Sequence, residues 1–228
     1  MQPFTIKYKP KKTSEIIGQD DAIKKLKNFV VYFKKQKKNA ALLYGPSGTG
    51  KTVSVHAIAN ELNLEILEVN ASDVRNAEQI NSIIGSAAGQ MSLFFKEKII
   101  LVDEIDGLSG TKDRGGLQAI IKLIEKSAFP LILTTTNPWD YKFNKLRRNT
   151  EMIEFAPLDY LSIFEILKKI CEQEKIKYEE EILKGLARRA GNDARAAIND
   201  LEILTIEAKE LTKKSLEELG ERNKLDTM

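Results

Sequence analysis

Apolar residues recur along the first part of the chain in two alternating patterns. Short apolar runs, and one run that alternates apolar with polar residues, predict strands. Between these runs, apolar residues return every three or four positions, which is the spacing of a helix with one buried face. The predicted strands lie at residues 40–44, 65–70, 99–102, 130–136 and 152–155. Strands that alternate with helices in this way predict an α/β fold with a five-stranded parallel sheet.

The pattern changes after Ala156-Pro157, because no strand pattern follows. Helical spacing continues over residues 160–174 and 179–190, from residue 194 onward, and more weakly after residue 212. Asp159 and Asp193 are each placed to cap the helix that follows them. We therefore predict three parts: an α/β core over residues 1–156, a small all-helical domain over residues 157–218, and a tail over residues 219–228.

Composition narrows the classes of protein without identifying one. The chain has 228 residues, 42% of them hydrophobic, and a formal net charge of +3, which is ordinary for a globular protein. It has neither a signal-peptide-like start nor an apolar run long enough to span a bilayer, so we expect a soluble, cytoplasmic protein with no membrane contact. A single cysteine, Cys171, excludes an internal disulfide. Eleven lysines precede Ala40, and charge alone favours a solvated helix face over a nucleic-acid contact.

One segment carries a specific chemical pattern. Residues 45–52 fit G-x-x-x-x-G-K-[ST] in full, between a predicted strand and a predicted helix. Glycines there let backbone N–H groups surround phosphates, and the start of the next helix favours negative charge. We expect Lys51 to contact the β- and γ-phosphates of a nucleotide and Thr52 to bind its Mg²⁺; a tight turn without a ligand is the alternative. The predicted phosphate-binding residues are Gly45, Pro46, Ser47, Gly48, Thr49, Gly50, Lys51 and Thr52.

Two carboxylates follow the most apolar predicted strand. Asp103 and Glu104 come directly after residues 99–102, and in an open parallel sheet ligands bind at the carboxyl ends of the strands. We expect Asp103 to hold Mg²⁺ and Glu104 to orient the attacking water in nucleotide hydrolysis. Asn137 follows the next strand and is placed to contact the γ-phosphate or that water. The alternatives are surface acids for the pair and an Asx turn before Pro138 for Asn137.

Two further regions are candidates for nucleotide contact. Arg195 lies in the first turn of a predicted helix, which is an unfavourable place for a cation, so we expect it to face phosphates across a cleft; solvent exposure is the alternative. The N-terminal arm, in which Pro3 and Pro10 disfavour regular structure, is placed to cover an adenine base with Tyr8, Pro10 and Ile17. Packing of the arm on the core explains the same residues.

Together these motifs resemble the AAA+ ATPases, and more closely replication factor C, the sliding-clamp loader. Three segments carry the likeness beside the phosphate loop and the Asp-Glu pair. Lys7-Tyr8-Lys9-Pro10 is similar to the family's N-terminal box, Asn70-Ala71-Ser72-Asp73 to its NASD segment, and Gly191-Asn192-Asp193-Ala194-Arg195 to its second sensor. The resemblance covers nearly the whole chain and implies an AAA+ core followed by a helical lid.

Departures from the family pattern indicate which subunit the chain resembles. Small subunits carry Ser-Arg-Cys before the last core strand, and its arginine completes a neighbour's ATP site; here Arg148-Asn149-Thr150 takes that place. Residues 103–107, 113–116 and 137–140 resemble the large subunit of the archaeal type. Because Arg147 and Arg148 lie close by, the possibility that one of them serves as a shifted arginine finger stays open. Family large subunits continue into a collar domain, which is absent here and toward which the tail would lead.

The resemblance implies an ATPase that loads the ring-shaped clamp onto primed double-stranded DNA, with ATP and Mg²⁺ as cofactors. ATP binding would order a hetero-oligomer with small subunits, and hydrolysis, which needs a neighbour's arginine, would release the clamp. The implied catalytic residues are Lys51, Asp103, Glu104, Asn137 and Arg195. The implied DNA contacts are Arg75, Lys112 and Arg114, and the implied clamp-docking residues are Ile83, Ile84, Met91, Phe94 and Phe95, for which core packing is the alternative. Such a protein is expected at the nucleoid.

Other interpretations stay open. A replication-origin initiator, also an AAA+ DNA-binding ATPase, needs a winged-helix domain for which 228 residues leave no room. A protein unfoldase needs an aromatic-hydrophobic-glycine pore loop, and none is evident. An ATP-locked scaffold that never hydrolyses its nucleotide also stays open, because Glu104 is present but its activating arginine must come from outside the chain. A nucleotide kinase shares the start of the phosphate loop but not the residues around it.

Overall fold

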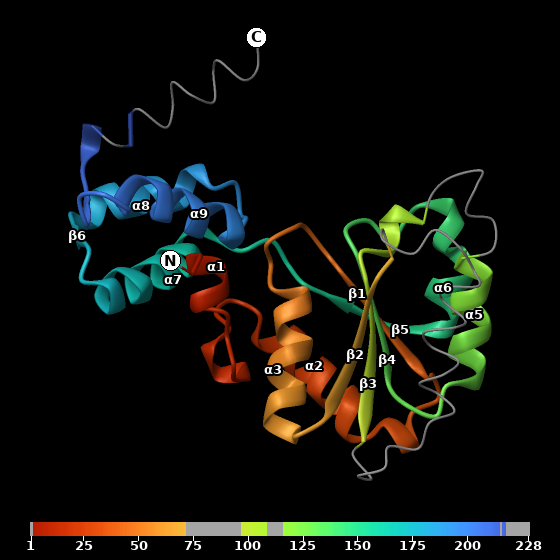
Figure 1. The fold of residues 1–228 in the computed structure, drawn as a ribbon. Helices are drawn as coiled ribbons and strands as arrows, with labels where there is room; N and C mark the ends of the chain where they lie inside the picture. The colour runs from red at the N-terminus through yellow and green to blue at the C-terminus, as the bar shows by residue number, and fades with distance from the viewer. Residues whose placement is uncertain (1, 72–96, 109–115, 215, 218–228) are drawn as a thin grey trace. The chain divides into compact units, whose positions relative to one another are not determined.

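The computed structural model describes residues 2–71, 97–108, 116–214 and 216–217. Contacts divide them into two compact units, and each is described by itself (Figure 1). The sheet unit comprises Pro10–Gly45 and Gly50–Phe155, and the helical unit comprises Met1–Lys9, Pro46–Thr49 and Ala156–Met228, in each case the described residues only. The division at Phe155 lies one residue from the boundary that the sequence predicts. The arm up to Lys9, however, groups with the helical unit rather than with the core.

The sheet unit contains five parallel strands in the order β2-β3-β4-β1-β5, which confirms the predicted sheet. The strands are β1 (Ala40–Tyr44), β2 (Glu65–Asn70), β3 (Lys98–Asp103), β4 (Leu131–Thr135) and β5 (Thr150–Glu154). Tyr44, at the end of β1, pairs with Thr135 on one side and Glu154 on the other. The segment after β1 therefore leaves from between two neighbouring strands, at the edge where open α/β sheets bind ligands.

Helices cover both faces of this sheet (Figure 1). One face carries α2 (Asp20–Val31) and α3 (Lys51–Leu62), and the other carries α5 (Gly116–Lys126) and α6 (Asn144–Asn149). Successive strand residues point to opposite faces, so Leu42 packs with Ile120 whereas Leu43 packs with Ile58. All four side chains are fully buried. Short 3₁₀ turns complete the unit: η1 (Thr13–Glu15), η2 (Phe33–Lys35), η3 (Ile105–Gly107) and η4 (Tyr141–Phe143).

The helical unit is built on α7 (Tyr160–Glu174), α8 (Glu180–Arg189) and α9 (Ala194–Thr205). Leu167, Leu186 and Leu201, one from each helix, are fully buried in a shared core. Both predicted caps are formed, because the Asp159 carboxylate accepts a hydrogen bond from Ser162 N at 2.7 Å and Asp193 accepts one from Ala196 N at 3.0 Å. Residues 213–214 and 216–217 are helical, as expected after residue 212.

Two expectations for the helical unit were wrong. The sequence predicts no strand after residue 156, but β6 (Lys177–Tyr178) and β7 (Glu210–Leu211) pair in parallel; two-residue strands are too short to show an alternating pattern. The prolines of the arm do not exclude regular structure, since Phe4–Lys7 forms the short helix α1 directly after Pro3. Proline's fixed φ suits the start of a helix.

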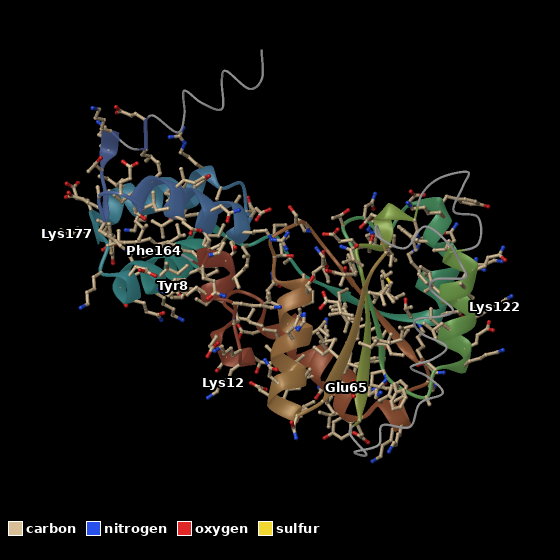
Figure 2. The ribbon with its side chains drawn as sticks, in the orientation of Figure 1. Tyr8, Lys12, Glu65, Lys122, Phe164 and Lys177 are labelled. Carbon is tan, nitrogen blue, oxygen red and sulfur yellow. The ribbon has the colours of Figure 1, made fainter. Side chains whose placement is uncertain are left out.

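The arm is anchored in the helical unit through its aromatic side chains. Phe4 is buried, and its ring meets the Tyr8 ring edge-on, with centroids 5.6 Å apart. Tyr8 packs against the same hydrophobic cluster that contains Phe164, and both side chains are labelled in Figure 2. The arm therefore contributes to the core of the helical unit.

Candidate nucleotide-binding site

The phosphate loop needs glycine at its first position. β1 ends at Tyr44, α3 begins at Lys51, and the loop lies between them. Gly45 has φ +142°, and a Cβ there would lie 2.0 Å from the carbonyl oxygen of Phe155. A side chain at this position would collide with backbone, which cannot move aside as a flexible side chain can. The close passage of the loop start over the residue after β5 thus explains the first glycine of the motif.

The start of α3 carries the two residues expected to meet phosphate and metal. Gly50, at φ +97°, precedes the helix in the left-handed conformation, which glycine adopts without steric cost. Lys51 Nζ donates a hydrogen bond to the carbonyl oxygen of Gly45 at 2.7 Å, so its ammonium group is folded back across the loop. The first backbone N–H groups of the 12-residue helix have no partner within the helix and favour an anion.

The structure brings the two predicted metal ligands together. Thr52 Oγ1 lies 3.0 Å from each carboxylate oxygen of Asp103. A hydroxyl and a carboxylate are the hard oxygen ligands that Mg²⁺ prefers. Among the described residues no three His, Cys, Asp or Glu side chains gather into a metal site. The hydroxyl and carboxylate of Thr52 and Asp103 fit Mg²⁺ bound together with a nucleotide.

Thr134 completes this cluster, although the sequence pattern alone assigned it no role. Its hydroxyl donates to Asp103 Oδ1 and accepts a hydrogen bond from the backbone N–H of Glu104 at 2.9 Å. The side chain is buried, with 1% of its surface exposed. It holds both members of the acidic pair from the neighbouring strand. A polar residue near the end of an otherwise apolar strand was the signal that could have identified it.

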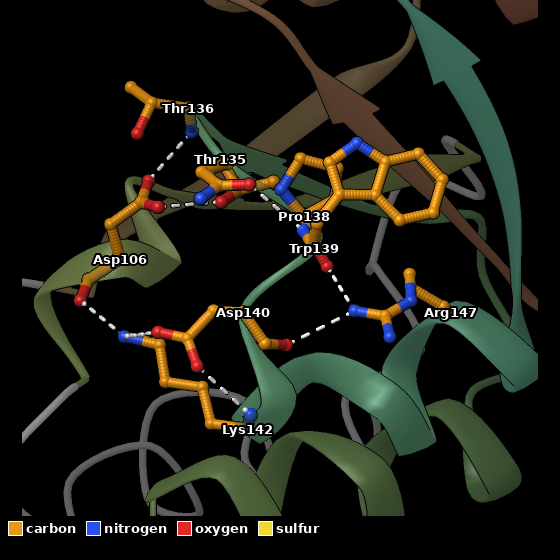
Figure 3. Close-up of polar contacts among 9 residues, drawn as sticks. Asp106, Thr135, Thr136, Pro138, Trp139, Asp140, Lys142 and Arg147 are labelled. Atoms are coloured by element: carbon orange, nitrogen blue, oxygen red, sulfur yellow. Dashed lines mark hydrogen bonds and ion pairs between the residues drawn. The ribbon is translucent and has the colours of Figure 1, made fainter.

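Glu104 leaves the sheet through a fixed turn. Its φ of +54° lies in the left-handed region, which residues other than glycine rarely adopt. The turn is anchored by Asp106, whose carboxylate accepts hydrogen bonds from Thr135 Oγ1 at 2.7 Å and from Thr136 N at 2.8 Å (Figure 3). Glu104 is exposed beside the partly buried Asp103, so its carboxylate is accessible to water, and its role in hydrolysis stays a prediction. Asp106 thus fixes the turn that follows Glu104, a role that no local sequence pattern indicated.

Asn137 forms the Asx turn that was its alternative interpretation. Its Oδ1 accepts a hydrogen bond from Trp139 N at 3.0 Å. The residue is exposed and follows β4 by two positions, at the same edge of the sheet as Tyr44 and Asp103. Because the oxygen is engaged in the turn, the Nδ2 amide is the group that would contact a phosphate or water.

The tip of the phosphate loop contacts the start of α9 within the helical unit. Ser47 Oγ donates to Asp193 Oδ2 at 2.7 Å, and Ala194 N donates to the carbonyl oxygen of Gly48 at 3.3 Å. A Cβ on Gly48 would lie 1.8 Å from Asp193 Oδ1. Asp193, expected only as a cap, is therefore also a partner of the loop. Arg195 is exposed in the first turn of the same helix, and its contact with phosphate stays a prediction.

The three residues expected to cover an adenine do not share a unit. Tyr8 lies in the helical unit, where its hydroxyl donates to Glu174 Oε1. Hydrogen bonds from Lys209, Lys7 and Tyr8 lower the pKa of Glu174 to about 2. Pro10 and Ile17 belong to the sheet unit. There Ile16, rather than Ile17, is buried, and it lies 3.8 Å from a Cβ built on Gly50.

The two arginines considered as a shifted finger differ in their surroundings. Arg147 donates to the carbonyl oxygens of Pro138 and Asp140, and its guanidinium lies 5.4 Å from the Trp139 ring centroid (Figure 3). These contacts hold Arg147 within its own loop. Arg148 is exposed at the end of α6. Of the two, Arg148 is the one presented to solvent.

Part of the candidate site lies outside the described residues. The DNA candidates Arg75, Lys112 and Arg114 and the clamp candidates Ile83, Ile84, Met91, Phe94 and Phe95 all do so. Their roles stay predictions. In the part of the chain that is described, no helix has the length and apolar character needed to cross a membrane.

Comparisons with known proteins agree with the two-part organisation. The family model "ATPase family associated with various cellular activities (AAA)" matches residues 41–157. The model "RCF1/5-like, AAA+ ATPase lid domain" matches residues 165–206. The solved structure of the Thermotoga maritima RuvB Holliday junction branch migration motor superposes with a TM-score of 0.73 at 21% identity, covering 92% of this chain and 71% of that one. At that identity the likeness shows the fold alone.

Several relatives carry the name replication factor C large subunit. The one from Nanoarchaeum equitans is 51% identical over 203 residues, which are 89% of this chain and 47% of the relative. The one from Staphylothermus marinus is 47% identical over 89% of this chain and 48% of the relative, and the one from Thermofilum pendens is 42% identical over 99% and 55%. The chain thus spans about half the length of the curated relatives it matches.

Proposed function

We propose that this chain, which belongs to the AAA family of ATPases, is the ATP-hydrolysing part of the large subunit of a sliding-clamp loader. The proposal is supported by its similarity, over most of its length, to archaeal replication factor C large subunits. ATP binding would order an assembly with small subunits that opens the clamp. Hydrolysis would then release the clamp on primed double-stranded DNA. The polar cluster of Thr52, Asp103 and Thr134 is the observation that carries the proposal.

The geometry of that cluster supports a separate role for each residue of the site. Thr52 and Asp103 would hold the Mg²⁺ ion, which when bound neutralises charge on the phosphates. Lys51 would leave the Gly45 carbonyl oxygen for the β- and γ-phosphates. Glu104, next to Asp103 and exposed, would orient and polarise the attacking water. Thr134 and Asp106 act on neither water nor phosphate, and instead fix the positions of the two acids.

Hydrolysis would also need a group from outside the chain. Phosphoryl transfer in this class is accelerated strongly by an arginine that stabilises charge in the transition state. Arg195 is proposed to contact the phosphates from the lid. Arg147 and Arg148 lie where small subunits carry the arginine that completes a neighbour's site, so neither would serve the site of this chain. The remaining arginine would come from an adjacent small subunit, so we expect the isolated chain to be a weak ATPase.

The DNA and clamp contacts belong to the proposal and not to the described structure. Arg75, Lys112 and Arg114 would contact DNA phosphates, which would make binding salt-sensitive and independent of sequence. Ile83 and Ile84, or Met91, Phe94 and Phe95, would dock on the clamp.

Co-elution with the clamp tests this function against a replication-origin initiator. The chain and archaeal small subunits are mixed with the clamp and Mg²⁺, with ATP or with ADP, and are separated by size-exclusion chromatography. A clamp loader should co-elute with the clamp when ATP is present, and Lys51→Ala in this chain should reduce the complex. An initiator would show no clamp complex in either nucleotide, which would refute the proposed function.

A further inference from the structure

A rigid aromatic side chain stands in solvent beside the site described above. Trp139, the only tryptophan of the chain, has 67% of its surface exposed. It is nevertheless held firmly: its backbone N–H donates to Asn137, the Tyr44 ring lies edge-on at 6.2 Å between centroids, and Arg147 lies 5.4 Å from the ring centroid. An exposed indole that is already fixed loses little freedom when a partner stacks on it.

A second aromatic residue and two cations follow Trp139 in the chain and are exposed as well. Tyr141 has 87% of its surface exposed, and Lys145 and Arg148 are exposed as well. Lys145 and Arg148 stand at positions i and i+3 of α6, so they share one side of that helix. Tyr141 opens the 3₁₀ turn η4 that leads into α6, whereas Phe143 and Leu146 of the same segment are fully buried.

Charges of both signs lie near these residues, and most of the acids already have partners. Lys142 reaches the Asp140 carboxylate at 3.7 Å and donates to the carbonyl oxygen of Asp106 at 3.2 Å (Figure 3), so the nearest acid is already paired with a cation. Glu151 and Glu154, on β5, are exposed as well, and Glu154 accepts a hydrogen bond from the Tyr44 hydroxyl. In the described part of the chain neither Lys145 nor Arg148 forms an ion pair with an acid, so these two cations are available to an anionic partner.

We propose that the surface formed by Trp139, Tyr141, Lys145 and Arg148, here called the aromatic stripe, binds single-stranded nucleic acid by stacking unpaired bases on its rings and pairing its cations with the phosphates. Aromatic rings interleaved with cations are the arrangement that binds single strands without sequence preference. A duplex keeps its bases stacked within the helix and offers only phosphates to such a surface. None of these four residues is among those assigned to the nucleotide site, so this binding needs neither ATP nor the proposed clamp-loading function.

Trp139 supplies a direct readout, because as the only tryptophan it reports on the stripe alone. Oligothymidylate is titrated into the full chain while tryptophan fluorescence is followed, and the anisotropy of a labelled oligothymidylate is measured in parallel. Stacking should quench Trp139 fluorescence at the same concentrations at which anisotropy rises. A duplex of equal length should bind more weakly and quench less.

Variants separate stacking from charge. Tyr141→Ala should weaken oligothymidylate binding about tenfold, as expected for one stacked base, whereas Tyr141→Phe, which keeps the ring, should bind like the parent. The pair Lys145→Ala and Arg148→Ala should weaken binding and make it less dependent on salt. Lys122→Ala with Lys126→Ala removes the same charge from exposed positions on α5 and should leave the affinity near that of the parent.

Three results would overturn the proposal. One is oligothymidylate binding that leaves Trp139 fluorescence unchanged, or no binding at all. Another is equal or tighter binding of the duplex. The third is a Trp139 signal that changes only on adding small subunits or on self-association of the chain, which would assign the stripe to a protein partner. Since Tyr141 is 87% exposed, its substitution tests the stripe without disturbing the core, and clamp co-elution independently tests the proposed function.

Discussion

Replacing Thr134 with valine removes one hydroxyl group while keeping the branched shape of the side chain. In the parent that hydroxyl donates to Asp103 and accepts from Glu104 N, and it is buried. Losing two hydrogen bonds and leaving a backbone N–H without its partner should cost about 2–3 kcal/mol of stability. For a chain of this size that lowers the melting temperature by about 4–12 °C.

The same substitution should affect nucleotide binding in a specific way. Without Thr134, Asp103 loses a donor that orients its carboxylate, and we expect the affinity for ATP with Mg²⁺ to fall about tenfold, or ~1.4 kcal/mol. The affinity for ATP in the presence of EDTA should stay close to the parent value, because Lys51 and the loop are untouched. Isothermal titration calorimetry measures both affinities, and thermal unfolding measures the loss of stability.

Thr135→Val is the matched control. Thr135 is the next residue on β4, is equally buried, and donates to Asp106 rather than to Asp103. It should therefore lose stability to a similar degree without a change in Mg²⁺-dependent affinity. The assignment of Thr134 would be refuted by parent-like Mg²⁺-dependent affinity in Thr134→Val, or by an equal loss in Thr135→Val.

Three further predictions follow from other contacts. Gly45→Ala should abolish ATP binding and lower the melting temperature sharply, because its Cβ would lie 2.0 Å from the Phe155 oxygen. Gly191→Ala, with φ +60° but no atom within 4 Å, should cost only about 1–2 kcal/mol of stability. Equal falls in melting temperature for the two variants, measured by calorimetry, would contradict the argument. Asp193→Asn keeps an N-cap but removes a negative charge bonded to Ser47, so ATP should bind up to about fivefold (~1 kcal/mol) more tightly; weaker binding would contradict this. Hydrogen bonds from Lys209, Lys7 and Tyr8 lower the pKa of Glu174 from 4.5 to about 2, so its carboxylate stabilises the helical unit above pH 4.5 and loses that contribution as pH falls toward 2. Thermal unfolding of Glu174→Gln across this range should lack that pH dependence, and a profile identical to that of the parent would show that Glu174 does not cause it.

The parallel sheet and the alternation of its strands with helices follow directly from the sequence. A continuous apolar run such as residues 99–102 is accommodated best as a buried strand. The phosphate loop and the Thr52–Asp103 pair were predictable for a related reason. The motif fixes local geometry, and the carboxyl ends of neighbouring parallel strands meet at one edge.

Residues whose roles depend on cross-strand contacts could not be predicted in the same way. Thr134 binds Asp103 across 31 positions and Asp106 binds Thr135 across 29, and no local pattern records such pairs. The N-terminal arm is a similar case. The sequence suggested that Tyr8 covers an adenine base, but it could not reveal that the Tyr8 hydroxyl donates to Glu174, which lies 166 positions away in the chain. Asp193 is a third case. Its sequence position predicts a helix cap, and nothing in that local pattern indicates its second hydrogen-bond partner, Ser47.

Stimulated ATP hydrolysis tests most directly the claim that this chain holds an ATP site that a neighbour completes. The chain is assayed alone and with small subunits whose own phosphate-loop lysine is replaced, together with clamp and primed DNA, so that only this site is read. We predict weak hydrolysis alone, stimulation of up to about 10³-fold in the mixture, and loss of the stimulated rate with Glu104→Gln. Full activity of the isolated chain, or an unchanged rate with Glu104→Gln, would contradict the account.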